Sequence, residues 1–194
     1  MTAAETPATK KQWRRWLRQI ARPPSAAVSE QVLRHLGEFL DSRPGPVLTY
    51  RPIPGELDLD RLLSRPDSGR FRVTRTNSNG PLTVHSAAAP TELHHYGFAQ
   101  PTTIAEEVDP ATIDIVLVPA VAFGRDGSRL GHGAGYYDRL LPNVGTGAAL
   151  VGVAYEAIVA RTVPVDHHDV PMTHLVTETG MATPRVEVID NFGR

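Results

Sequence analysis

A glycine-rich loop is the segment of this sequence whose residue types and spacing are best suited to chemistry. Glycine recurs at positions 131, 133 and 135, and a helical pattern begins directly after the last of them. Glycine leaves backbone N–H groups uncovered, and N–H groups at the start of a helix attract phosphate. Arg129 precedes the glycines as a permanent cation, and Asp138 follows them as an oxygen ligand suited to Mg²⁺.

The glycine spacing by itself leaves two interpretations open. It lacks the Gly-Lys-Ser/Thr of a Walker loop, and its last two glycines are not spaced as in a dinucleotide-binding fingerprint. The glycines alone are therefore compatible with a plain flexible turn or with an anion site. The flanking Arg129 and Asp138 favour the anion site.

A buried strand is expected immediately before this loop. Residues 113–118 are Ile, Val and Leu apart from Asp114, a pattern typical of a central parallel strand that is buried on both faces. In open α/β sheets, ligands bind beyond the carboxyl ends of the strands. The sequence therefore predicts that the glycine loop lies at the ligand-binding edge of a sheet.

The remaining segments alternate between helical and extended patterns. The predicted helices are 10–20, a helix from the N-cap Ser25 to Pro44, 57–63, 135–141 and 156–161. The predicted strands are 47–50, the hairpin pair 71–74 and 81–85, 113–118, 149–154, 175–177 and 185–189. This order predicts a three-layer α/β/α sandwich around a mostly parallel, mixed sheet, similar to a Rossmann fold. We expect one domain over residues 1–194, with 1–9 as a flexible tail.

Composition narrows the class of protein. The chain has 194 residues, a net charge of -1 and no cysteine, which suits one compact domain and excludes a disulfide scaffold or a Cys-ligated zinc site. The first 22 residues carry +5 and the rest carry -6. No apolar targeting or membrane-spanning segment is evident, so a cytoplasmic protein is expected.

The basic N-terminal helix has three interpretations. Its cations beside Trp13 and Trp16 would suit a nucleic-acid patch, a membrane surface or a solvated helix face. One basic helix on a chain of net charge -1 is a poor footprint for a nucleic-acid duplex. We expect no nucleic-acid or membrane partner, and a monomer.

Residues 129–141, Arg-Leu-Gly-His-Gly-Ala-Gly-Tyr-Tyr-Asp-Arg-Leu-Leu, resemble the signature of the 5-formyltetrahydrofolate cyclo-ligases, also called 5,10-methenyltetrahydrofolate synthetases. The resemblance extends to Lys10 with Arg14, to 50–56 and 119–141, and to 152–155 and 164–169. It implies an ATP- and Mg²⁺-dependent ring closure. The formyl oxygen of 5-formyltetrahydrofolate, with or without a polyglutamate tail, is phosphorylated, N10 attacks the activated carbon, and phosphate leaves. ADP and 5,10-methenyltetrahydrofolate are the other products.

The resemblance also implies roles for individual residues. The implied ATP-binding residues are Lys10, Lys11, Arg14, Arg129, Leu130, Gly131, His132, Gly133, Ala134, Gly135, Tyr136 and Tyr137. The implied folate-binding residues are Arg51, Glu56, Tyr96, His132, Gly133, Ala134, Gly135 and Tyr136. The implied catalytic residues are Arg129, Tyr137 and Asp138, and the implied Mg²⁺ ligands are Asp138 and Asp169.

Two points of this assignment stay open. Lys10 and Arg14 lie one helical turn apart and so share a face, but Lys11 and Arg15 have the same spacing. The chain also departs from the usual family pattern, with Ile158 in place of glutamine, Thr173 in place of an acid, and different residues at His132 and Ala134. The alternative function is therefore that of a divergent relative that binds nucleotide, folate or RNA without this turnover.

Overall fold

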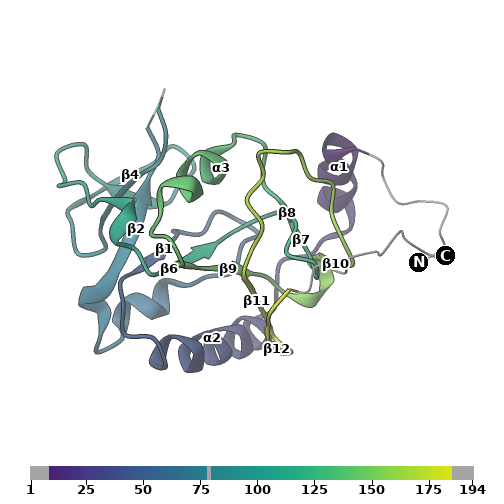
Figure 1. Ribbon diagram of the computed structural model, residues 1–194, viewed down its shortest axis with the longest axis horizontal. Helices are drawn as coiled ribbons and strands as arrows, with labels where there is room; N and C mark the ends of the chain where they lie inside the picture. The colour runs from purple at the N-terminus through teal and green to yellow at the C-terminus, as the bar shows by residue number, and fades with distance from the viewer. Residues whose placement is uncertain (1–8, 78–79, 185–194) are drawn as a thin grey trace, which may run out of the picture.

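A seven-stranded sheet forms the centre of the molecule (Figure 1). The structure is a computed structural model, and it describes residues 9–77 and 80–184. The strand order is β12-β11-β9-β6-β1-β2-β3. The strands are β1 (Val47–Thr49), β2 (Phe71–Arg75), β3 (Thr83–Ser86), β6 (Ile115–Val118), β9 (Ala149–Val153), β11 (His174–Thr177) and β12 (Gly180–Ala182). The five inner strands are parallel and the two edge strands antiparallel, which confirms the predicted mixed sheet.

Strand β6 lies in the middle of this sheet, between β1 and β9, as its apolar sequence predicts. Its register pairs Ile115 with Val47 on one side and with Ala149 on the other. All four of its residues are buried. Burial on both faces fixes the position of β6 in the sheet. The chain continues from its carboxyl end through β7 and β8 to the glycine loop.

Two longer helices have well-defined starts. Helix α1 (Lys10–Ile20) begins with a capping box, in which the Thr9 hydroxyl accepts from the Gln12 N–H and the Gln12 side chain accepts from the Thr9 N–H. Thr9 therefore belongs to the helix start and not to the expected tail, whose residues 1–8 lie outside the described ranges. Ser25 caps α2 (Ala26–Asp41), as predicted, by accepting from the Val28 N–H.

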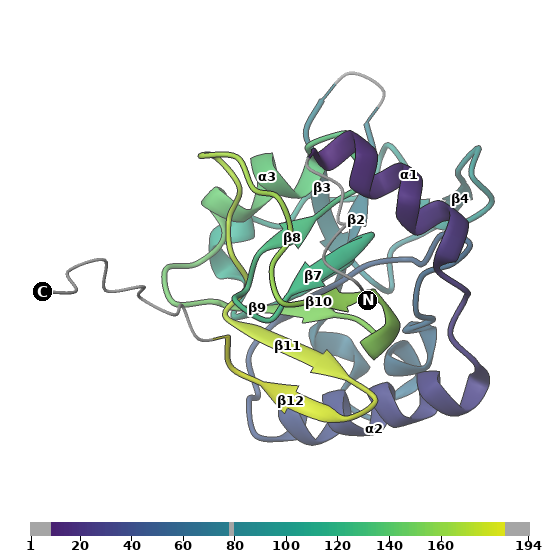
Figure 2. The ribbon, with the colours of Figure 1, turned by 90° about the vertical axis from the view of Figure 1, so that its right-hand side faces the viewer.

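The layers follow from where these helices lie. Helix α2 covers one face of the large sheet, while α3 (Tyr136–Leu140) and a smaller sheet lie on the opposite side (Figures 1 and 2). The smaller sheet has the order β10-β7-β8, from β7 (Ala122–Gly124), β8 (Arg129–Leu130) and β10 (Val159–Ala160). Trp13 and Leu17 of α1 pack on it, against Ala122 and Leu130. This packing holds the basic helix next to the glycine loop.

Several local predictions need correction. Within 57–63 the only helix is the 3-10 turn η1 (Asp60–Ser64), because the Asp58 carboxylate accepts the Asp60 N–H and closes a local turn. Within 156–161 a 3-10 turn, η5 (Glu156–Ile158), leads into β10, which pairs with β7. The predicted strand 185–189 lies outside the described residues.

The other short elements connect these layers. A second hairpin, β4 (Thr91–Leu93) with β5 (Ala99–Pro101), stands beside β2 and was not predicted. Three further 3-10 turns are η2 (Ser68–Arg70), η3 (Pro110–Thr112) and η4 (Leu141–Asn143). Among the described residues, no helix has the length and apolar character needed to cross a bilayer.

Gly152 of β9 tests how tightly the sheet packs against its neighbours. A Cβ at this position would lie 2.6 Å from Cε1 of the fully buried Phe123 and 3.1 Å from Cδ1 of Leu175. We expect Gly152→Ala to lower the free energy of unfolding by about 1–3 kcal/mol, since an added methyl group overpacks a full core. Urea unfolding measures this. Gly69→Ala, where a Cβ would have open space, is the matched control, and equal stability of the two variants would contradict the packing described.

Candidate active site

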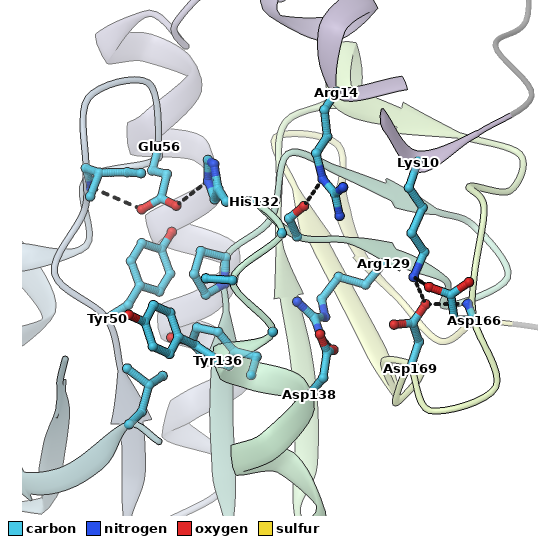
Figure 3. Close-up of a pocket in the computed structure, with 18 of the residues that line it drawn as sticks. Lys10, Arg14, Tyr50, Glu56, Arg129, His132, Tyr136, Asp138, Asp166 and Asp169 are labelled. Carbon is cyan, nitrogen blue, oxygen red and sulfur yellow. Dashed lines mark hydrogen bonds and ion pairs between the residues drawn. The ribbon is translucent and has the colours of Figure 1, made fainter. Parts of the chain in front are cut away.

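A cavity of about 760 Å³ opens under the glycine loop, where α1, the carboxyl end of β1 and the start of α3 meet (Figure 3). Its volume is within the range of roughly 300–1,000 Å³ that is typical of small-molecule sites. Most of the residues singled out from the sequence line it. The structure thus brings together segments that are more than 150 positions apart in the chain, from Lys10 to Asp169.

The glycine loop joins β8 to α3 and owes its shape to two left-handed residues. Gly133 has φ +109° and Gly135, the N-cap of α3, has φ +66°, conformations that other residues adopt at a cost. No side chain in the described part of the chain caps α3, so its first N–H groups are not covered by a capping residue. This is the backbone arrangement that the sequence pattern predicts for holding an anion.

Helix α1 presents its cations to this loop. The Arg14 Nε donates to the Gly131 carbonyl at 2.7 Å, and Lys10 and Lys11 also line the cavity. Arg15 is exposed and lies outside the cavity. Of the two registers left open by the sequence, the structure therefore places Lys10 and Arg14 together on the inward face.

Lys10 forms ion pairs with two carboxylates of the loop that follows Pro164. Its Nζ lies 2.7 Å from Asp166 and also contacts Asp169 (Figure 3). Burial favours a lower pKa for Lys10, but the hydrogen bonds to Asp166 and Asp169 outweigh it and raise the pKa. Burial favours a higher pKa for Asp169, but Lys10 lowers it below the usual carboxyl value. Both groups are held charged.

Arg129 and Asp138 form the second ion pair of the cavity. The Arg129 side chain is only 4% exposed, its Nη2 donates to Asp138, and its Nε has no hydrogen-bond partner among the described residues. The guanidinium also lies over the Tyr137 ring, 5.9 Å from its centroid. A buried cation with an unpaired N–H can accept a further anionic partner.

Tyr137 places a neutral hydroxyl beside this pair. Its hydroxyl is buried and has no hydrogen-bond partner of full geometry within residues 9–77 and 80–184, although the nearby Thr74 side chain slightly favours the ionised form. Burial, together with the charge of Glu56, raises the pKa of Tyr137 far above its ordinary value. The hydroxyl is therefore protonated at neutral pH and can donate to a ligand.

The two carboxylates predicted to bind Mg²⁺ both line the cavity, but each is paired with a different basic side chain. Asp138 is paired with Arg129, and Asp169 with Lys10. Asp169 also belongs to a group with Asp166 and His168, whose ligand atoms all lie within 4.8 Å of one another. Asp166 and Asp169 supply carboxylate oxygens, the donors that Mg²⁺ prefers, whereas Asp138 lies outside this group of three.

The other half of the cavity contains Glu56. This side chain is 11% exposed, and its Oε2 accepts from the Ile53 N–H at 3.1 Å while its Oε1 lies 3.2 Å from Nε2 of His132. Tyr50 lies below it and donates to the Leu57 carbonyl; burial raises the pKa of Tyr50 well above its usual value. Figure 3 shows Glu56, Tyr50 and Tyr136 on one side of the cavity and the cations of α1 on the other.

Three of the predicted site residues either lie away from the cavity or are paired with another side chain. Arg51 lines the cavity, where its guanidinium lies 2.8 Å from Asp60. Leu130 is fully buried, with its side chain under α1, and does not line the cavity. Tyr96 is 66% exposed in the turn between β4 and β5, where it contacts the rings of His94 and His95 instead of the cavity.

The sequence did not single out several residues that line the cavity. Phe98, two positions after Tyr96 and directly before β5, lines the cavity. Asp166, three positions before Asp169, pairs with the same lysine and had a signal in the sequence, because two acids at this spacing follow Pro164. Thr74 and Leu82 reach it from the first hairpin, where their positions depend on strand register.

Comparison with known proteins gives consistent results. The sequence model of the 5-formyltetrahydrofolate cyclo-ligase family matches residues 8–178. The 5-formyltetrahydrofolate cyclo-ligase of Mycolicibacterium smegmatis is 33% identical over 186 residues, which cover 89% of this chain and 95% of that protein. The solution structure of Aquifex aeolicus 5,10-methenyltetrahydrofolate synthetase superposes with a TM-score of 0.74 at 30% identity, over 95% of this chain and 99% of that one. A synthetase from Mycoplasma pneumoniae, at 22% identity and a TM-score of 0.70 over 88% of this chain and 99% of that one, shares the fold.

The pairing of Lys10 with Asp169 predicts a pH-dependent contribution to stability. A lowered carboxyl pKa stabilises the fold above the usual carboxyl value, about pH 4, and a raised lysine pKa does so below about pH 10. We expect Lys10→Met to lower the free energy of unfolding by about 1–3 kcal/mol at pH 7, as for a charge-assisted hydrogen bond. The difference from the wild type should shrink as the pH falls through the pKa of Asp169.

Denaturant unfolding from pH 7 to pH 3 measures this difference. Lys11→Met is the matched control, because Lys11 is exposed and has no ion-pair partner among the residues that the structure describes. A loss that is equally large in acid would show that the Lys10 contribution is not electrostatic.

Proposed function

The chain belongs to the 5-formyltetrahydrofolate cyclo-ligase family, and from this premise we propose that it converts 5-formyltetrahydrofolate to 5,10-methenyltetrahydrofolate in the cavity under the glycine loop, with ATP as phosphate donor. The protein is a ligase that makes 5,10-methenyltetrahydrofolate. The proposal concerns the residues, the ATP and the Mg²⁺ with which it does so. We further propose a cytoplasmic monomer that acts on small molecules alone.

The observation that carries the proposal is the division of the cavity into two halves of different chemistry. One half holds cations and uncovered backbone N–H groups, from Lys10, Arg14, Arg129 and the glycine loop. The other half holds the Glu56 carboxylate beside Tyr50 and Tyr136 (Figure 3). A triphosphate fits the first half, and an aromatic heterocycle with amino and N–H donors fits the second.

We assign the phosphates to the first half on electrostatic grounds. Arg14 and Lys10 approach from α1, and Arg129 from the strand before the loop. The residual N–H of Arg129 and the first N–H groups of α3 can bind the γ-phosphate, whose charge moves as the phosphoryl group is transferred. These groups are already in position, so little reorganisation is needed during the reaction.

The pterin is assigned to the second half because Glu56 can accept two hydrogen bonds. Each of its oxygens already accepts or faces one protein group, which leaves the remaining lone pairs for the amino and ring N–H groups of the pterin. This places the formyl group toward the centre of the cavity. There the neutral Tyr137 hydroxyl is positioned to donate to the formyl oxygen or to the phosphate that it receives.

The reaction divides into two steps at this position. The formyl oxygen attacks the γ-phosphorus of ATP, and ADP leaves. N10 then attacks the formyl carbon and gives up its proton, and the C–O bond breaks with the oxygen leaving as part of phosphate. The residues contribute mainly alignment and charge neutralisation, which is what phosphoryl transfer requires of a protein.

Mg²⁺ would be held by Asp138 and Asp169, which line the phosphate half of the cavity. When bound, the ion supplies neutralisation of the phosphate oxygens. With the ion bound, Asp138 and Asp169 would have a partner besides Arg129 and Lys10, and these two cations could then also pair with phosphate from where they lie. The same two ion pairs thereby keep both sets of charges compensated before substrates bind.

A spectrophotometric assay tests the reaction. We expect the absorbance of the methenyl product to appear only when ATP, Mg²⁺ and 5-formyltetrahydrofolate are all present. Stabilisation of the protein by these ligands in thermal unfolding, without any product, would instead support the divergent relative that binds without turnover.

Two substitutions test the division of the cavity. We expect Arg14→Gln to raise the KM for ATP, and Glu56→Gln to raise the KM for 5-formyltetrahydrofolate, each by about 30-fold for a loss of about 2 kcal/mol. The KM for the other substrate should change much less in each variant. Steady-state kinetics with both substrates varied gives all four values.

Arg15→Gln is the matched control, because Arg15 neighbours Arg14 on α1 but is exposed outside the cavity. The control should keep the wild-type KM for ATP. A larger effect of Arg15→Gln than of Arg14→Gln would reverse the register of the helix, and an exchange of the two KM effects would reverse the two halves.

A further inference from the structure

His132 connects the two halves of the cavity. It lies on the glycine loop, between Gly131 and Gly133, and its Nε2 lies 3.2 Å from Oε1 of Glu56, which is 76 positions away in the chain (Figure 3). The His132 side chain is 54% exposed, and Glu56 provides its one polar contact among the described residues. The contact with Glu56 is therefore the polar interaction that orients the His132 ring.

The segment that carries His132 depends on what lies beneath it. Gly133 has a left-handed backbone, and the loop is tied to α1 by the bond from Arg14 to the Gly131 carbonyl. Arg14 is also one of the cations assigned to phosphate. A nucleotide that engages Arg14 and the loop N–H groups therefore fixes the backbone on both sides of His132.

Glu56 depends on the same contact from the opposite wall. Its Oε2 is fixed by the Ile53 N–H, while its Oε1 faces His132. The nearby cation Arg51 pairs with Asp60 instead. His132 is thus the side chain from the nucleotide half that orients the carboxylate of the folate half, and a ring N–H donated to one lone pair leaves the other lone pairs of Glu56 directed at the ligand.

The contact also forms part of the cavity wall. A smaller groove of about 340 Å³ lies on the far side, and Arg14, Glu56 and His132 line both spaces. With His132 against Glu56, the two spaces are separated at this point. A loop fixed by nucleotide keeps this wall in place while the folate binds.

From these contacts we infer that His132 is a positioning residue that couples the two substrates, so that bound nucleotide increases the affinity for folate, and the reverse. The inference rests on the proposed assignment of nucleotide and folate to the two halves. Its physical basis is that a ligand in either half restrains one end of the bridge between His132 and Glu56, so the second ligand meets a residue that is already held in place. Thermodynamic linkage requires the two increases in affinity to be equal.

Isothermal titration with a non-hydrolysable ATP analogue, Mg²⁺ and 5-formyltetrahydrofolate measures the coupling. For the wild type we expect each ligand to bind about tenfold more tightly when the other is saturating, within the usual range of such couplings. For His132→Ala we expect this factor to fall to near one, with the affinity for the first ligand changed less than about threefold, because the bridge is then absent in both states. His132→Gln, which keeps an N–H donor, should restore part of the coupling.

Two controls separate this role from a structural one. His95→Ala removes an exposed histidine outside the cavity and should keep the full coupling. The thermal midpoint of unliganded His132→Ala should be close to that of the wild type, because the side chain is 54% exposed. In turnover, His132→Ala should raise the KM for folate at saturating ATP by about the coupling factor that is lost, and His132→Gln should restore part of it.

The outcomes are distinct from those that test the proposed function. Full coupling in His132→Ala, or ligands that bind the wild type independently or in competition, would overturn the inference while both substrates still bind. Failure of either ligand to bind the wild type alone or together with the other would instead overturn the assignment of the cavity.

Discussion

The packing of Trp13 and Leu17 against the small sheet is the interaction on which the rest of the site depends. These side chains are buried on Ala122 and Leu130, and they hold α1 above the loop. Loss of a buried aromatic side chain costs about 3–5 kcal/mol, whereas a charge-assisted hydrogen bond contributes about 1.5–3 kcal/mol. The apolar contact is therefore the larger of the two, and the polar contacts of Lys10 and Arg14 select the orientation of a helix that is already docked. Without this packing, the cavity would lose Lys10 and Arg14, the cations that α1 carries into it.

A second constraint is that the cavity must hold its charges without ligands. Buried cations are costly unless they are paired, and a phosphate site needs several of them. The structure meets this requirement with two ion pairs, Arg129 with Asp138 and Lys10 with Asp169, whose acids are also the proposed Mg²⁺ ligands. The near-neutral net charge and the basic N-terminal stretch are consistent with this arrangement, since the cations of α1 meet the acids of the remainder in one cavity.

The parts of the fold that the sequence could predict are those that follow from local patterns. The apolar run of β6 fixes the centre of the sheet, and the helix boundaries follow from capping residues and prolines. The small sheet could not be predicted, because its strands are two or three residues long, too short to show a period in the sequence. Tyr96 and Phe98 show the same limit within the site. Tyr96 lies within the β4–β5 turn, which is closed by bonds from the His94 N–H to the Phe98 carbonyl and from the Gly97 N–H to the His94 carbonyl, and only Phe98 reaches the cavity.

The departures from the family pattern divide into two kinds once their surroundings are known. Ile158 is buried in the main core, and the Thr173 hydroxyl bonds to the backbone of Leu150, so both have structural partners and neither lines the cavity. A change at such positions alters packing between β9 and its neighbours, and leaves the charges of the site unaffected. The two departures in the loop are of the other kind, since His132 and Ala134 line the cavity. Ala134 adds a methyl group to a segment that acts through its backbone, whereas His132 adds a polar side chain that reaches the opposite wall. Of these four departures, His132 is therefore the one most able to change function, more so than Ala134, Ile158 or Thr173.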